Sequence, residues 1–124
     1  MDVVTSSDGT ARIGSAGFEP RAVNRWDDGR PTVLLAWEGE VDLEQVAVLR
    51  QEIDRLPVAD VRLDLGRVSF IDSCGLGLLV QLRNRVRANG RRVVLLNVPP
   101  QVRRVMEITG LDRVFDTAEA SSAL

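Results

Sequence analysis

Three residue types on which many active sites depend are absent or nearly absent from this chain of 124 residues. It has no histidine, which excludes a Ser-His-Asp triad and a histidine-based metal site. It has no lysine, because all 16 basic residues are arginine, and this excludes Schiff-base chemistry and a Walker-type lysine. The single cysteine excludes an intrachain disulfide and a cysteine-built zinc site, and it favours a reducing compartment.

Long apolar runs are absent as well. No stretch approaches the roughly 20 apolar residues of a membrane span, and the first ten residues lack the basic-then-apolar order of a signal peptide. The net charge of −2 gives no general attraction to nucleic acid or to anionic lipid. We therefore expect a cytoplasmic protein that binds neither nucleic acid nor membranes.

What remains is the composition of an ordinary globular domain, with 44% hydrophobic and 27% charged residues. The length fits one domain with a core of its own. Residues 1–19 are rich in Ser, Gly, Ala and Asp, and they predict a flexible N-terminal tail or at most a loosely attached strand. Residues 20–124 are predicted to form the folded domain.

Strands and helices are expected to alternate along that domain. Two strands, 21–26 and 32–37, flank a turn at 27–31 and predict a hairpin. The spacing of apolar residues then predicts a helix over 43–56, a strand over 61–65, a loop over 66–72, a helix over 73–88, a strand over 92–97, a helix ending at Gly110, a short strand over 111–115 and a short or frayed helix over 117–124. This order predicts an α/β fold with a mixed sheet of about five strands and helices mainly on one face.

Ser73 lies where the chain passes from a strand region into a helix. A serine at this place is a preferred N-cap, because its oxygen accepts a hydrogen bond from a free backbone N–H. The same N–H groups and the helix dipole also favour a phosphate. The residues alone thus leave two interpretations, a structural cap and a phosphorylated switch.

Two short motifs resemble a known family. The sequence F-I-D-S-C-G-L-G covers Phe70–Gly77, and G-E-V-D covers Gly39–Asp42 some thirty residues earlier. Together they resemble the STAS domain, and more narrowly the bacterial anti-sigma factor antagonists. The resemblance covers roughly residues 21–124 and implies a single STAS-like domain. In that family the serine directly after the aspartate is phosphorylated, which corresponds to Ser73, whereas Cys74 replaces a second hydroxyl residue.

Three acidic residues accompany the two motifs. Asp42, Glu40 and Asp72 are expected to lie together if both motif loops leave the carboxyl ends of parallel strands. The resemblance implies that Asp42 lies close to the acceptor serine, where it could orient the hydroxyl or help to hold the metal of a kinase. The alternatives are a helix cap for Asp42 and a solvated turn residue for Asp72. We predict no metal site of the protein's own, because hard cations need six or more oxygen ligands.

The helix that follows Ser73 begins with an almost wholly apolar run. We predict a docking surface at Gly75, Leu76 and Leu78, with Leu79 and Val80 in the core. The alternative is that the extra apolar residues contact a neighbouring helix. Partner binding is thus predicted for Glu40, Asp42, Asp72, Ser73, Cys74, Gly75, Leu76 and Leu78.

Two other groups of residues have competing interpretations. Cys74 at a helix N-terminus could be a redox sensor, but no resolving cysteine exists, and a small replacement for Ser or Thr is the plainer interpretation. Arg83, Arg85 and Arg87 lie near the predicted C-terminus of the same helix, where cations suit the dipole. Anion binding is the alternative for these arginines.

The resemblance implies a regulatory protein without catalytic residues or a cofactor of its own. It would bind an anti-sigma factor, which is a serine kinase supplying ATP and Mg²⁺, and would release the sigma factor. Phosphorylation at Ser73 would end binding, and a PP2C-like phosphatase would restore it. One alternative is a non-phosphorylated STAS module in a larger signalling or transport-regulating assembly. Another is a hydrolase or transferase with a Ser73 or Cys74 nucleophile, although only carboxylates could then act as the base. A weak homodimer also remains open.

Overall fold

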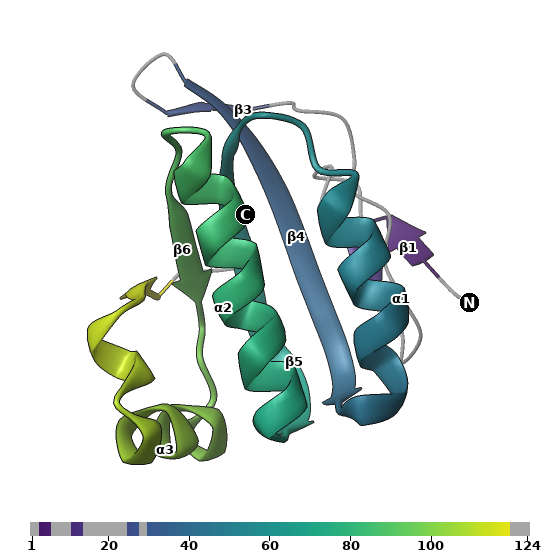
Figure 1. Cartoon of the computed structure of the whole chain (residues 1–124), viewed down its shortest axis with the longest axis vertical. Coiled ribbons are helices and arrows are strands. Elements are labelled where there is room, and N and C mark those ends of the chain that lie inside the picture. Colours follow the sequence, from purple (N-terminus) through teal and green to yellow (C-terminus); the bar gives the residue numbers. More distant parts are fainter. Residues whose placement is uncertain (1–2, 6–10, 14–24, 28–29, 120–124) are drawn as a thin grey trace.

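The computed structural model describes residues 3–5, 11–13, 25–27 and 30–119, and side chains from residue 31 onward. Helices and strands alternate over most of this length (Figure 1). In chain order the elements are β1 (Val3–Thr5), β2 (Ala11–Ile13), β3 (Arg25–Asp27), β4 (Arg30–Val41), α1 (Leu43–Asp54), β5 (Asp60–Ile71), α2 (Ser73–Ala88), β6 (Val93–Leu96), α3 (Pro100–Thr109), the 3₁₀ helix η1 (Leu111–Arg113) and β7 (Asp116–Ala118).

The strands form one mixed sheet. Its order is β1-β2-β4-β5-β6-β7, and β3 pairs with β4 outside this path. The pairs β2–β4, β4–β5, β5–β6 and β6–β7 are parallel, whereas β1–β2 and β3–β4 are antiparallel. The mixed α/β sheet and the β3–β4 hairpin are therefore confirmed. The sheet has seven strands among the described residues, where about five were predicted, because it includes short strands of only three residues.

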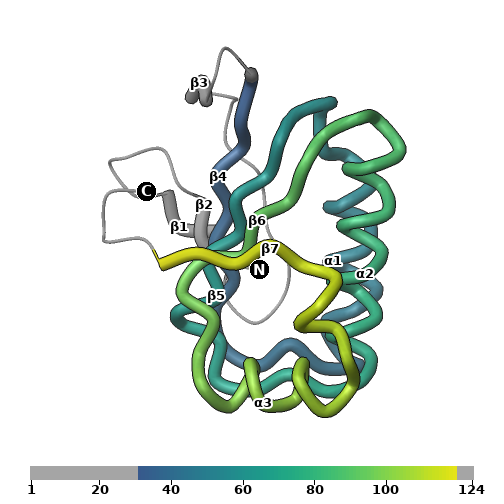
Figure 2. The backbone as a smooth tube through the Cα atoms, turned by 90° about the vertical axis from the view of Figure 1, so that its left-hand side faces the viewer, coloured from purple at the N-terminus to yellow at the C-terminus, as the bar shows by residue number. Residues whose placement is uncertain are grey.

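Helices α1 and α2 lie side by side over one face of the sheet (Figures 1 and 2), as predicted. The core lies between this helical layer and the central strands, and α3 covers one end of it. Fully or almost fully buried members include Leu49, Ile53, Leu63, Leu65, Leu79, Leu82, Leu95, Val102 and Met106. Arg85 ties the two helices together, since its Nη2 donates to the backbone oxygen of Asp54 (2.7 Å) in the last turn of α1.

The ends of these elements follow local chemistry. The apolar run Val33–Trp37 is buried on both faces of β4, as its lack of alternation predicts. Pro100 opens α3 in the first turn, where its missing N–H has no helical partner to lose. Gly110 ends α3 with a φ of +80°, a left-handed conformation that favours glycine. Helix α1 ends at Asp54, two residues before the predicted end.

Several predicted chain segments need correction. The predicted loop over 66–72 is wrong, because β5 continues through Ile71. The predicted strand over 111–115 is wrong too: η1 occupies Leu111–Arg113 and the last strand follows at Asp116. The predicted helix over 117–124 begins inside β7, and residues 120–124 lie outside the described residues. Within the predicted tail, β1 and β2 are strands; the rest of 1–19, like 21–24 of the first predicted strand, is outside the described residues.

The extra length of β5 has a regular structural cause. Relative to β4, its register shifts twice, between Ala36 and Glu38 and again between Gly39 and Glu40. Each shift inserts one additional residue into β5, as a β-bulge does. The buried positions accordingly alternate up to Leu65 and then recur every third residue, at Val68 and Ile71. The alternation that indicates a strand in the sequence therefore stops at Leu65, although β5 itself continues to Ile71.

Candidate functional site

The two sequence motifs meet at one edge of the sheet. Val41, the last residue of β4, is paired with Ile71, the last residue of β5. The backbone N–H of Asp72 donates to the backbone oxygen of Val41 (3.3 Å). Helices α1 and α2 begin within two residues of these strand ends, so their N-termini lie next to each other. The expectation that both motif loops converge is confirmed.

Each helix is capped by the aspartate that precedes it. Asp42 Oδ1 accepts a hydrogen bond from the backbone N–H of Glu44 (3.1 Å). Asp72 Oδ1 accepts one from the backbone N–H of Gly75 (2.9 Å). The cap interpretation of Asp42 is therefore confirmed. The interpretation of Ser73 as an N-cap is wrong, because Asp72 takes that place, and Asp72 is more than a solvated turn residue.

Ser73 is the first residue of α2 and is exposed to solvent. Within the described part of the chain its hydroxyl has no hydrogen-bond partner. Because Asp72 satisfies the cap, the Ser73 hydroxyl is not needed for helix stability. A serine hydroxyl thus lies accessible at the positive end of a 16-residue helix, beside three acidic residues of the two motifs.

Gly75 lets α2 approach the sheet edge closely. A Cβ added at this position would meet the backbone oxygen of Val41 and would lie 2.7 Å from Ile71 Cγ1. Such a contact requires neighbouring atoms to move. Gly77, in contrast, has no atom within 4 Å of an added Cβ, so it lies on the open side of the helix. The first glycine is therefore needed for close packing. The second lies on the outer surface of α2, where it adds no side chain.

The predicted docking residues of α2 are largely inside the protein. Leu76 is 5% exposed and Leu78 1% exposed, and Gly75 is also buried. Their burial contradicts the prediction that these three residues face a partner. Leu76 and Leu78 belong to the core cluster, since α2 packs against both the sheet and the neighbouring helix α1. Leu79 is in the core as predicted, and Val80 packs against it.

Two exposed apolar residues take their place at this edge, and sequence reasoning missed both. Phe70 on β5 is 49% exposed, and Leu43 at the start of α1 is 69% exposed. Phe70 is paired in register with Glu40 on β4, which is exposed too. The signal for Phe70 was its place as the first residue of the motif, but the loop predicted over 66–72 gave no indication of the face to which it points. For Leu43 the signal was its position before the first buried residue of the helix.

Besides the serine and the acidic residues, the site contains one thiol. Cys74 is a free, partly exposed cysteine next to Ser73. Among the described residues, no group of His, Cys, Asp and Glu side chains is arranged to hold a metal ion. No helix within the same part of the chain is both long and apolar enough to cross a bilayer.

Comparison with known proteins agrees with this fold and these motifs. The model of the STAS domain family matches residues 26–123, and the chain belongs to that family. The anti-sigma-B factor antagonist of Bacillus subtilis is 35% identical over 85 residues, which cover 67% of this chain and 78% of that protein. The anti-sigma F factor antagonist of Lysinibacillus sphaericus is 33% identical over 86 residues, covering 66% and 74%.

Solved structures of an anti-sigma factor antagonist have a similar fold. The unphosphorylated form of the anti-sigma factor antagonist SpoIIAA has a TM-score of 0.61 at 25% identity, covering 83% of this chain and 88% of that one. The phosphorylated form of Bacillus SpoIIAA has a TM-score of 0.64 at 27% identity, covering 84% and 91%. The relatives of this chain are therefore regulatory proteins named for their opposition to anti-sigma factors.

Proposed function

We propose that the chain is an anti-sigma factor antagonist that binds an anti-sigma factor with a serine kinase activity, and that phosphorylation of Ser73 switches this binding off. The observation that carries the proposal is the exposed Ser73 hydroxyl at the first position of α2, where Asp72 performs the capping. The named relatives, one of which has a structure in a phosphorylated form, support the same assignment.

The contact surface in this proposal is the sheet edge around Ser73. It combines the exposed apolar side chains of Phe70 and Leu43 with the carboxylates of Glu40, Asp42 and Asp72. Exposed aromatic and aliphatic groups supply the area that a partner can bury, and the acidic rim orients it. Residues Leu76 and Leu78 contribute only by supporting this surface from the core.

Phosphorylation would change this surface without unfolding the domain. It adds about −1.5 to −2 charges and three acceptor oxygens. The N-terminus of α2 tolerates that charge locally, because free N–H groups and the helix dipole point towards it. A partner that covers Ser73 would have to bury the phosphate next to three carboxylates, which is unfavourable unless it supplies matching cations. Binding is therefore lost while the fold persists.

The kinase would supply ATP and Mg²⁺, and a PP2C-like phosphatase would remove the phosphate. The chain itself acts in this scheme as a binding partner and as a substrate. Its sigma factor would become free when the unphosphorylated chain captures the anti-sigma factor.

Mass spectrometry after incubation with candidate anti-sigma factors, ATP and Mg²⁺ tests the proposal. We expect one added phosphate on Ser73, none in Ser73→Ala, and an unchanged level in Ser69→Ala, which removes an exposed hydroxyl nearby on β5. Ser73→Ala should still bind the anti-sigma factor in calorimetry, whereas the phosphorylated chain should not. Binding without any phosphorylation would instead assign a STAS module of a larger assembly. Phosphate on Ser69 would refute the assignment of Ser73.

A further inference from the structure

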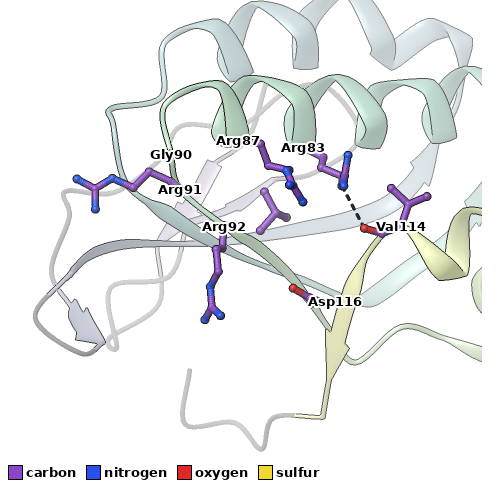
Figure 3. Close-up of a pocket in the computed structure, with 8 residues that line it drawn as sticks. Arg83, Arg87, Gly90, Arg91, Arg92, Val114 and Asp116 are labelled. Carbon is purple, nitrogen blue, oxygen red and sulfur yellow. Dashed lines mark hydrogen bonds between the residues drawn. The ribbon is translucent and has the colours of Figure 1, made fainter.

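A second charged region lies at the opposite end of α2. There a cavity of about 320 Å³ is lined by Arg83, Arg87, Gly90, Arg91, Arg92, Val93, Val114 and Asp116 (Figure 3). Ser73 and Arg87 are fourteen residues apart on one helix, which separates them by about 20 Å. The cavity is therefore distinct from the surface around Ser73, and a ligand bound there would be independent of the proposed function.

The charge of this cavity is unbalanced. Four arginines and one aspartate line it, so its local charge is +3, although the whole chain carries −2. Within the described residues none of the four guanidinium groups forms an ion pair. These positive charges line one cavity, and a bound anion would offset them.

The helix dipole does not account for all of this charge. Arg87 lies in the last turn of α2, where a cation is favourable, and Arg83 is one turn earlier. Arg91 and Arg92 come after the helix, on the connection to β6, so the dipole gives no reason for them. Arg85 also lies in the last turn but serves another purpose, since it donates to backbone oxygens at the end of α1.

The four side chains differ in how they are held, and Arg83 has a hydrogen bond of its own. Arg83 and Arg87 extend from α2 towards the strands, and Arg83 Nε donates to the backbone oxygen of Val114 (3.1 Å) (Figure 3). Arg91 and Arg92 point in different directions away from α2. The backbone of Arg92 is nevertheless fixed, because its N–H donates to Asp60 Oδ1 (3.0 Å). Their Cα atoms are thus in place while their guanidinium groups remain able to turn towards a ligand.

We propose that this cavity binds a small anion with two or more phosphate groups. A local charge of +3 calls for a multiply charged ligand. Guanidinium groups match phosphate oxygens with paired hydrogen bonds. The volume is at the lower end of small-molecule sites and exceeds what one phosphate fills. Val93 and Val114 add an apolar side to the cavity for the non-phosphate part of such a molecule.

Calorimetric titration of the full chain with pyrophosphate, at a constant ionic strength of about 0.15 M, tests this proposal. We expect saturable binding with one site. Arg87→Gln and Arg92→Gln should each weaken it at least about tenfold, the loss typical of one charged hydrogen bond. Asp116→Asn should tighten binding, because it removes the one negative charge in the cavity. The matched control is Arg104→Gln, which removes an exposed arginine on α3 and should change affinity by less than about twofold.

Changes in the backbone amide chemical shifts on addition of pyrophosphate show where the ligand binds. Shifts confined to the 90–93 connection and β7 would support the proposal, and circular dichroism would establish that each variant is folded. No saturable binding, or an equal loss in Arg104→Gln, would overturn it, as would shifts centred on Ser73. Displacement of pyrophosphate by a polyglutamate peptide of higher affinity would assign the cavity to an acidic protein segment instead.

Discussion

The two ends of α2 differ in how closely the helix approaches the sheet and in the sign of the charged side chains around them. At the N-terminus, Gly75 and Leu76 press the helix against the sheet edge, and acidic side chains face outward. At the C-terminus, the helix stands off from β7 over an open cavity, and the nearby charged side chains are mostly arginines. Both ends complement the helix dipole, and core side chains such as Val86 are buried near the C-terminal end too, but at Gly75 the helix backbone itself lies against the strand ends. A rigid end suits a surface that must present one hydroxyl, and an open end suits a ligand that enters.

Truncation of apolar residues should separate the two ends most strongly. Leu76→Ala removes a side chain that is 5% exposed, so the free energy of unfolding should fall by about 2–5 kcal/mol. Val114→Ala, at the cavity, removes a side chain that is 39% exposed and should change it by less than about 0.5 kcal/mol. Urea denaturation measures both. Equal losses would mean that Val114 is packed at the cavity as firmly as Leu76 is at the sheet edge.

The glycines of the first two turns provide a sharper comparison. Gly75→Ala should lower the free energy of unfolding by about 1–3 kcal/mol, because the new Cβ meets Val41 and Ile71. Gly77→Ala meets nothing and should raise it by up to about 1 kcal/mol through helix propensity. Denaturation midpoints of the two variants test whether their changes in the free energy of unfolding have opposite signs. A stabilised Gly75→Ala would show that the helix can move away from the sheet edge.

Capping at the N-terminal end gives the next smaller effect. Asp72→Ala should lower the free energy of unfolding by about 1 kcal/mol, because the Gly75 N–H loses its acceptor. Asp72→Asn keeps an acceptor and should be close to the parent protein. Ser73→Ala should change stability by less than about 0.5 kcal/mol. If Ser73→Ala cost as much as Asp72→Ala, the hydroxyl would be structural after all.

The smallest effect on stability is expected at Phe70. This side chain is 49% exposed, so Phe70→Ala should leave the free energy of unfolding within about 0.5 kcal/mol of the parent value. On the proposed function it should weaken binding to the anti-sigma factor by more than about tenfold, as an aromatic anchor does. Ile108→Ala on α3, which is 74% exposed, is the control and should leave binding unchanged. Calorimetric titration of the parent protein, Phe70→Ala and Ile108→Ala with the anti-sigma factor measures these affinities. Equal affinities for all three would contradict a role of Phe70 in binding.

The sequence predicted those features that depend on short-range patterns. Apolar periodicity located α1, α2 and the buried strands, and the alternation of elements implied parallel pairing with helices on one face. The position of Asp42 and Asp72 after paired strands followed from topology. The choice between Asp72 and Ser73 as the cap could not be predicted, because both residue types cap helices well and the decision depends on where the first turn begins.

The remaining errors have a common origin in long-range packing. Leu76 and Leu78 were predicted to face a partner because the helix carries more apolar residues than one sheet face needs. Both residues are buried in the core, where α2 packs against the sheet and against α1, and no local pattern reveals this burial. Anion binding was left open for Arg83, Arg85 and Arg87, but the cavity itself was hidden, since Arg83 and Arg87 come to line it with Arg92 and Asp116 only through the strand order β6–β7.

The two register shifts between β4 and β5 make the position of the Ser73 surface a matter of chain length. Each inserted residue breaks the period of two in β5, while the pairing with β4 resumes directly after it: Phe70 lies opposite Glu40 and Ile71 opposite Val41. Loss of an inserted residue such as Ser69 would therefore remove one bulge and leave these two pairs in place. Loss of a residue from the regularly paired stretch Val61–Asp64 would instead shift the side chains that follow to the other face. Deletions are thus tolerated at different places in β5 to very different degrees.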